Sequence, residues 1–226
     1  MSLGAVALEA TGIYYIFRER DVETVALRGA GITLEAGSWT SVMGRSGSGK
    51  STLVHVLAGL LEPAAGSVLI HGEDITRLPG PERAQRRRRE IGVVLQRENL
   101  HPLLDVGQNV ALALRLDRCP REVVRERTRE LLAAVGLADR ESQPGRSLSG
   151  GEAQRVAIAA ALACKPSVLL ADELTGELDA GNTSAVLDLL AELRDREGTA
   201  VLTVTHNPLV AARADRGLTM HDGQLQ

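Results

Sequence analysis

The segment GRSGSGKST, residues 44–52, places three glycines, a lysine and several hydroxyl side chains between two apolar runs. In the pattern G-x-x-x-x-G-K-(S/T), glycines let the backbone turn so that successive N–H groups face a phosphate. Lys50 then reaches the β- and γ-phosphates, Ser51 ligates Mg²⁺, and the following helix adds its positive end. The motif predicts a nucleoside triphosphate site made of Gly44, Arg45, Ser46, Gly47, Ser48, Gly49, Lys50, Ser51 and Thr52.

A second chemical feature is the pair of carboxylates that ends the apolar run SVLLADE, residues 167–173. Asp172 is placed to hold Mg²⁺, through water, and Glu173 to polarise a water molecule for attack on the γ-phosphate. The alternative is a strand that simply ends in two solvated acids. Together with the phosphate loop, the metal and catalytic interpretation is favoured.

The third feature is LSGGEAQR, residues 148–155, which opens the apolar helix AQRVAIAAALA. A serine N-cap at Ser149 explains why a helix starts here. It does not explain Gly150 and Gly151, because two consecutive glycines weaken a helix. Their N–H groups and the helix end are suited to contact a phosphate without side-chain obstruction.

These motifs resemble those of ATP-binding cassette (ABC) ATPases, which the chain matches in order over nearly its whole length. It also carries Gln96 after a strand, GELD at residues 176–179 and His206 in TVTHN. The resemblance implies ATP and Mg²⁺ as cofactors. Taken alone, Gln96 could be any polar loop residue and His206 a hydrogen-bonded residue at a strand end.

The resemblance also assigns roles to individual residues. Catalytic roles go to Glu173, His206, which contacts the γ-phosphate, and Gln96, which senses Mg²⁺ and the attacking water. ATP contacts outside the phosphate loop go to Ser149, Gly150, Gly151 and Asp179, and metal contacts go to Ser51, Gln96 and Asp172.

In the family an aromatic ring upstream of the glycine loop stacks on adenine. The chain has four aromatic residues, and counting back from VALRG makes Phe17 the best match and Tyr15 the second choice. Stacking contributes about 1 kcal/mol, so affinity should depend mainly on the phosphates. Trp39, which lies in a strand, is interpreted as a packing residue.

Two positions depart from the family pattern. Leu174 stands where a proline usually follows the catalytic glutamate, and Glu152 replaces the commoner glutamine of the signature. Without the proline, Glu173 is expected to be less restricted in conformation.

The elements that must position these residues follow an α/β pattern, in which apolar bursts alternate with longer helix-like segments around a mainly parallel sheet. Strands are predicted at residues 38–43, 67–71, 91–95, 167–171 and 200–205. Helices are predicted to begin at Lys50, at Ser149 and at about Ala180. The first 35 residues and the last ten are expected to be extended pieces that flank this core.

Between Gln96 and about residue 147, two amphipathic helical patterns follow each other without a strand. The resemblance accordingly implies a P-loop NTPase core with a mainly parallel sheet, an antiparallel β flank and an inserted α-helical subdomain. We expect one nucleotide-binding domain over residues 1–226. Residues 1–95 and 148–226 form its core, and residues 96–147 form the helical insertion.

Composition limits the partners. A net charge of −3 over 226 residues gives no global basic field, so no nucleic acid is expected. Two cysteines are too few for a disulfide framework, and the N-terminus lacks a signal-peptide pattern, which favours the cytosol. No run reaches about 18 uninterrupted apolar residues, so a membrane role must come through a partner.

The one strongly basic cluster comprises Arg83 and the four arginines at residues 86–89. Most such runs are solvated helix faces, and that is the favoured interpretation. Binding of phospholipid headgroups near a membrane partner comes second, and nucleic acid comes last.

Within the family, the chain looks most like the ATPases of the macrolide-exporter, lipoprotein-release and cell-division group. This resemblance implies a head-to-tail homodimer with an ATP between one subunit's phosphate loop and the other's signature. It also implies an integral-membrane permease as a separate chain, which holds the ATPase at the cytoplasmic face of the cell membrane. The expected work is export of a hydrophobic or amphiphilic substrate of the haem, peptide, macrolide or lipoprotein class. The alternatives are a cell-division ATPase that transmits a signal across the membrane and a soluble non-transport ABC ATPase.

Overall fold

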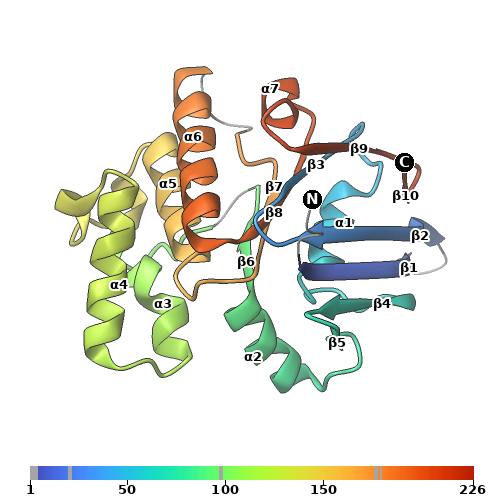
Figure 1. Cartoon of the computed structure of the whole chain (residues 1–226), viewed down its shortest axis with the longest axis horizontal. Helices are drawn as coiled ribbons and strands as arrows, with labels where there is room; N and C mark the ends of the chain where they lie inside the picture. The colour runs from blue at the N-terminus through green and yellow to red at the C-terminus, as the bar shows by residue number, and fades with distance from the viewer. Residues whose placement is uncertain (1–4, 20–21, 97–98, 176–177, 179) are drawn as a thin grey trace.

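The computed structural model describes residues 5–19, 22–96, 99–175, 178 and 180–226. A central sheet runs through the molecule, with a second, antiparallel sheet on one side and a group of helices on the other (Figure 1). No helix formed by the described residues is both long enough and apolar enough to cross a membrane.

The central sheet has the strand order β10-β9-β3-β8-β7-β6. Its strands are β3 (Trp39–Met43), β6 (Ile91–Val94), β7 (Val168–Asp172), β8 (Ala200–Thr205), β9 (Arg216–His221) and β10 (Gln224–Leu225). All neighbours pair in parallel except β10, which is antiparallel to β9. Every residue of β7 and β8 is buried, as expected for apolar strands covered on both faces.

The register of the parallel strands brings their carboxyl ends to one edge of the sheet. Met43 of β3 lies opposite Thr205 of β8, and Asp172 of β7 lies opposite Val204 of β8. The loops that follow these strands therefore emerge side by side, where ligands bind in open α/β sheets.

The second sheet has the order β2-β1-β4-β5 and is antiparallel throughout. Its strands are β1 (Val6–Glu19), β2 (Val22–Glu35), β4 (Ala65–Ile70) and β5 (Glu73–Asp74). The strand predicted at residues 67–71 is thus present, but it pairs with β1 in this sheet and not in the central one. Helix α1 (Lys50–Leu57) shares one hydrophobic core with this sheet and with buried residues of the central strands.

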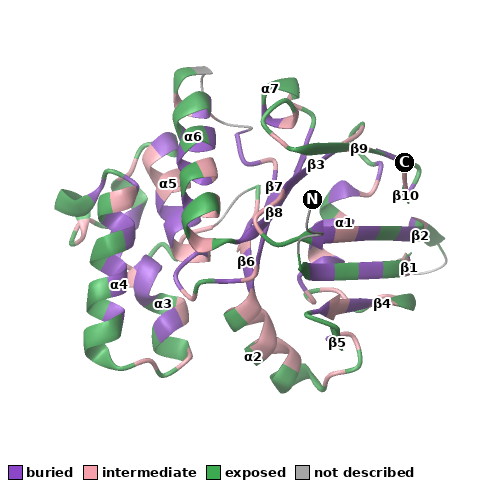
Figure 2. Cartoon of the chain, in the orientation of Figure 1, coloured by how far each residue is buried: buried purple, intermediate pink, exposed green. Residues whose placement is uncertain are grey.

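A second hydrophobic core lies among the helices and central strands. The helices are α3 (Val106–Leu116), α4 (Arg121–Ala134), α5 (Gly150–Ala161) and α6 (Ala180–Glu197), with a short α7 (Pro208–Ala211) after β8. The described part of the predicted insertion holds α3, α4, two 3-10 turns (Ala138–Arg140 and Gly145–Ser147) and an isolated β-bridge. Because α5 packs against α3 and α4, the insertion shares its core with the helix that follows it (Figure 2).

The basic cluster lies on α2 (Gly80–Glu90), a helix the sequence analysis did not delimit. All five of its arginines have partners within the chain. Arg86 pairs with Glu73 at 2.7 Å, and Arg89 pairs with Asp117 at 2.8 Å. The others contact Glu62 and the carbonyl oxygens of Gly59 and Leu116. The contacts of these arginines therefore tie α2 to the segment after α1, to β5 and to the end of α3.

A buried arginine on α4 contacts the C-terminal ends of α5 and α6. The side chain of Arg127, on α4, is 6% exposed and pairs at 3.0 Å with Glu197, the last residue of α6. It also donates to the carbonyl oxygens of Leu162 and Ala163 at the end of α5. Burial would raise the pKa of Glu197, but the hydrogen bond and charge of Arg127, with help from Arg196, lower it below its ordinary value.

Replacing Arg127 by methionine should lower the free energy of unfolding by about 2–3 kcal/mol, below the full cost of an unpaired buried charge, because the buried Glu197 keeps only its contact with Arg196, whose side chain is 38% exposed. The loss should shrink on acidification: the pair's contribution is present above the unfolded-state pKa of Glu197 and disappears as the pH falls through the lower folded-state pKa. Urea denaturation measures both effects. The matched control is Arg129→Met on the same helix, whose side chain is 63% exposed and should cost at most about 1 kcal/mol. Equal losses for the two variants would contradict the account.

Candidate functional site

A cavity of about 930 Å³ lies at the carboxyl edge of the central sheet and is bordered by the loop between β3 and α1. The loop contributes Arg45, Ser46, Gly47, Gly49, Lys50, Ser51 and Thr52 to the lining. Gly44 and Ser48, also predicted as nucleotide-binding, do not line it. A Cβ on Gly44 would lie 2.5 Å from the Met220 carbonyl oxygen, so this glycine is required by close packing against β9.

Backbone conformation explains two of the loop glycines. Gly47 and Gly49 have φ of 78° and 107°, in the left-handed region that favours glycine. Gly49 is also the N-cap of α1 and makes no side-chain cap hydrogen bond. The first N–H groups of α1 are therefore not capped by the N-cap side chain and can face an anion.

The Lys50 ammonium lies inside the loop. The residue is 7% exposed, and its Nζ donates to the carbonyl oxygens of Gly44 at 2.9 Å and Arg45 at 3.0 Å. The charge is thus held at the loop, where it can also meet a phosphate that enters the cavity.

Asp172 presents a carboxylate next to Ser51. It is 4% exposed, and its Oδ1 has no partner in the described part of the chain. Burial raises the pKa of Asp172 above its ordinary value and the charge of Glu173 adds to this, whereas the Ser51 hydrogen bond opposes it. A buried carboxylate oxygen without a partner beside a hydroxyl is a donor set that fits Mg²⁺.

Glu173 is held by its surroundings, although Leu174 follows it where the family has proline. Its N–H donates to the Val204 carbonyl oxygen at 2.9 Å, and its carboxylate contacts Thr205 Oγ1 at 3.3 Å and His206 Nδ1 at 2.9 Å. Leu174 itself is 2% exposed and belongs to the core. Tertiary contacts therefore restrict Glu173 without a proline. Its φ of 50° is unfavourable for a non-glycine residue, and such conformations often mark functional sites.

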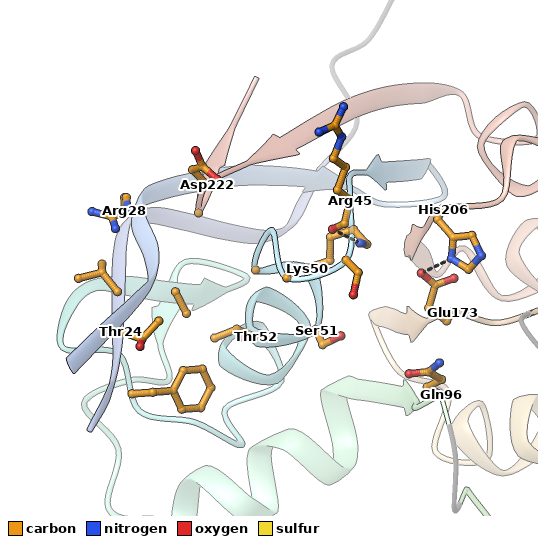
Figure 3. A pocket seen from close by; sticks show the side chains of 17 residues that line it. Thr24, Arg28, Arg45, Lys50, Ser51, Thr52, Gln96, Glu173, His206 and Asp222 are labelled. Carbon is orange, nitrogen blue, oxygen red and sulfur yellow. Dashed lines mark hydrogen bonds and ion pairs between the residues drawn. The ribbon is translucent and has the colours of Figure 1, made fainter. Parts of the chain in front are cut away.

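Figure 3 shows how the side chains are distributed around the loop. Glu173, His206 and Gln96 lie at one end of the cavity, and Thr24 and Arg28 lie at the other. Gln96 is exposed and also lines a neighbouring groove of about 320 Å³, to which Gly150 contributes. Gln96 thus joins the cavity to the start of α5. Asp179, the remaining predicted ATP contact, lies outside the described residues.

Ser149, Gly150 and Gly151 are not among the described residues that line the cavity of their own chain. Ser149 caps α5, and Glu152 accepts from its N–H and its hydroxyl at 2.9 Å each, which lowers the pKa of Glu152 below its ordinary value. The glutamate thus completes a capping box as glutamine would.

Gly150 has ordinary φ, and a Cβ there would meet no described atom within 4 Å. Nothing in the described chain therefore requires glycine at this position.

Phe17, Tyr15 and Trp39 lie in three different environments. Phe17 is 42% exposed and lines the cavity. Tyr15 does not line it but packs against the core and supports Phe17 in an edge-on contact, with ring centroids 4.9 Å apart. Trp39 is 1% exposed and donates to Thr203 Oγ1, which confirms its packing role.

Several residues of the cavity were not predicted from the sequence. These are Thr24, Val25, Ala26 and Arg28 of β2, with Asp222 and Gly223 of the turn between β9 and β10. No local motif marks them, because the pairing of distant strands brings them to the loop.

Comparisons with known proteins agree with this geometry. A family profile described as ABC transporter matches residues 27–176. The lipoprotein-releasing system ATP-binding protein LolD of Shewanella sp. (strain MR-4) is 41% identical over 221 residues, which are 98% of this chain and 96% of that protein. LolD 1 of Caulobacter vibrioides is 43% identical over 219 residues, 96% of this chain and 94% of that protein.

Two solved structures are also similar. The dimeric structure of MJ0796, a bacterial ABC transporter cassette, has a TM-score of 0.89 and 34% identity, and the match covers 97% of this chain and 96% of that one. A dimeric post-hydrolysis state of the ATP-binding cassette MJ0796, bound to ADP and Pi, gives a TM-score of 0.89 and 33% identity, with the same coverage.

The placement of the two rings predicts their effects on ATP binding. Phe17→Ala should weaken ATP affinity about fivefold, the equivalent of about 1 kcal/mol of stacking. Tyr15→Ala should change affinity less, because this ring does not reach the cavity, and should instead lower the melting temperature. Titration calorimetry and thermal melts separate the two effects. A larger loss of affinity for Tyr15→Ala than for Phe17→Ala would show that adenine uses the other ring.

Proposed function

The chain belongs to the ABC transporter family and is an ATP-hydrolysing subunit of such a transporter, and from this premise we propose that two copies enclose two ATP molecules head to tail. The observation that carries the proposal is the surface at residues 149–151, where Gly150 is open although its own chain does not require glycine. In a two-fold dimer each phosphate loop meets the partner's signature, and each signature meets the partner's loop. The dimeric cassettes to which this chain is similar support this arrangement.

In this proposal the phosphate end of ATP occupies the cavity at residues 44–52. Lys50 contacts the β- and γ-phosphates, while Ser51 and Asp172 hold Mg²⁺ with help from Gln96. When bound, Mg²⁺ neutralises charge on the phosphate oxygens during transfer. Phe17 stacks on adenine, and the partner's Gly150 and Gly151 N–H groups face the γ-phosphate.

Glu173 acts as the general base. Its carboxylate orients the attacking water and accepts its proton. His206 is 73% exposed and holds Glu173 through Nδ1, which leaves Nε2 to face the γ-phosphate. A protonated imidazole donates from both nitrogens and can bridge the two groups.

The permease is proposed to contact a groove of about 490 Å³ lined by residues of α2, α3 and α5. Exposed apolar side chains contribute to it: Leu112 and Leu116 line the groove and are 38% and 59% exposed. Asn99 lines this groove and also the smaller one shared by Gln96 and Gly150. A continuous path therefore leads from the ATP cavity to the proposed contact surface.

The substrate proposed for the transporter is a lipoprotein. The names of the LolD relatives support release of lipoproteins over the haem, peptide and macrolide classes. In this proposal the chain lies at the cytoplasmic face of the membrane and is held there by the permease.

The general-base role predicts that Glu173→Gln lowers ATP hydrolysis by about 10²- to 10⁴-fold, because the amide cannot accept the water's proton. ATP binding should survive. Blocked hydrolysis should then let an ATP-bound dimer accumulate, which size-exclusion chromatography with and without ATP detects. Hydrolysis at the parent rate would contradict the role of Glu173.

Adding Gly150→Asp to Glu173→Gln should return the chain to monomers, since a negative side chain would oppose the partner's γ-phosphate. The matched control is Gly80→Asp, because Gly80 is also the first residue of a helix, has ordinary φ and lies in open space. This control should still form the dimer. A dimer that survives Gly150→Asp, or that forms without ATP, would reject the composite site.

A further inference from the structure

A cavity of about 680 Å³ lies between α3 and α4 and shares no lining residue with the nucleotide cavity. Its walls come from the facing sides of the two helices, which are adjacent in Figure 1, and from the loop after the first 3-10 turn. Its volume is that of a small-molecule site and far exceeds that of a single ion.

Three arginines line this cavity. Arg115 lies in the last turn of α3, and Arg121 and Arg125 lie one turn apart at the start of α4. Throughout the described ranges, the side chain of none of the three has a hydrogen bond or an ion pair. They differ in this from the arginines of α2, all of which have partners.

The acidic residues of the same cavity do not neutralise these arginines. Asp105 lies ten residues before Arg115 along α3, about 15 Å away along the helix axis, and its carboxylate caps the helix through Gln108 N–H. Glu141 packs near that same end, where its carbonyl oxygen accepts from Gly107, and its carboxylate lies 3.8 Å from Arg129. The cavity therefore has an end with three uncompensated positive charges.

The start of α4 adds to this positive end. Its N-cap is Pro120, which provides no side-chain hydrogen bond to the first N–H groups. Arg121 lies in the first turn, where a positive charge is unfavourable beside the positive helix end, and the nearby Glu122 does not line the cavity. An anion bound here would relieve the repulsion among these groups.

The cavity wall also contains an unsatisfied polar group. Thr128 of α4 is 3% exposed and lines the cavity, and its Oγ1 has no hydrogen-bond partner in the part of the chain that the structure describes. A buried polar group without a partner requires an explanation, and a ligand in the adjoining cavity that moves this side chain could supply the missing hydrogen bond.

We propose that this cavity is a second ligand site, which binds a phosphate ester through Arg115, Arg121 and Arg125. Planar guanidinium groups donate paired hydrogen bonds that match phosphate oxygens. The remaining volume accommodates the organic part of the ester. The ester is a soluble metabolite or the headgroup of an anionic phospholipid, since both present the same phosphate chemistry.

Binding of two probes tests the proposal, with ADP and Mg²⁺ kept at saturation so that the phosphate loop is occupied. One probe is glycerol 3-phosphate, followed by titration calorimetry. The other is vesicles of phosphatidylglycerol in phosphatidylcholine, with pure phosphatidylcholine as reference. The variant Arg121→Gln/Arg125→Gln keeps a polar side chain and similar helix propensity but removes the charges. Arg216→Gln on β9 is the control, because the Arg216 side chain has no partner in the described chain and does not line this cavity.

The proposal expects one or both probes to bind, and the double variant to weaken binding at least about tenfold. Arg216→Gln should leave binding within about twofold. Binding of glycerol 3-phosphate identifies a soluble ester, whereas binding of the anionic vesicles alone identifies a headgroup. Absence of binding in both arms, or equal losses for the double variant and the control, would overturn the proposal. Thermal melts with ADP establish that the variants are folded.

Discussion

Strands β3, β8 and β7 lie side by side in parallel register, with Met43 opposite Thr205 and Asp172 opposite Val204. The backbone hydrogen bonds of these pairs bring the phosphate loop, the two acids and His206 to one edge of the sheet. Because side chains alternate along a strand, a slip of one residue would exchange side chains between the two covered faces of the sheet and move Asp172 away from Ser51. The chemistry of the site therefore depends on a register that two hydrophobic cores stabilise.

Strand β2 of the antiparallel sheet passes close to the phosphate loop and to the turn between β9 and β10. The carbonyl oxygen of Ala26 lies 2.6 Å from where a Cβ would stand on either Gly49 or Gly223, so only glycine fits at both positions. The same approach brings β2 side chains to the cavity. On the opposite side Glu173 adopts a positive φ, which costs about 1 kcal/mol or more. Its contacts with Val204 and His206 hold it in this conformation.

Local patterns were sufficient to predict much of this architecture. The phosphate loop, the buried strands and the helix starts are encoded within ten or so consecutive residues. The same patterns could not show that the strand at residues 67–71 pairs with β1, because apolar runs of that length look alike in either sheet. Thr24 and Asp222 reach the cavity only through distant strand pairing. The arginines of α2 look free in the sequence, since their partners Glu73 and Asp117 lie on other elements.

The central claim is that each ATP site is completed by residues 149–151 of a second copy. An ATP analogue with a photoreactive group on its γ-phosphate tests this most directly, in a mixture of Lys50→Ala chains and intact chains of different mass. The Lys50→Ala chain lacks the ammonium group that is proposed to contact the phosphates. The account predicts that its peptide containing residues 149–151 is labelled only when intact chains are present. The account would be contradicted if only the intact chain were labelled in the mixture. It would also be contradicted if Lys50→Ala chains were labelled in a sample that contains no intact chains.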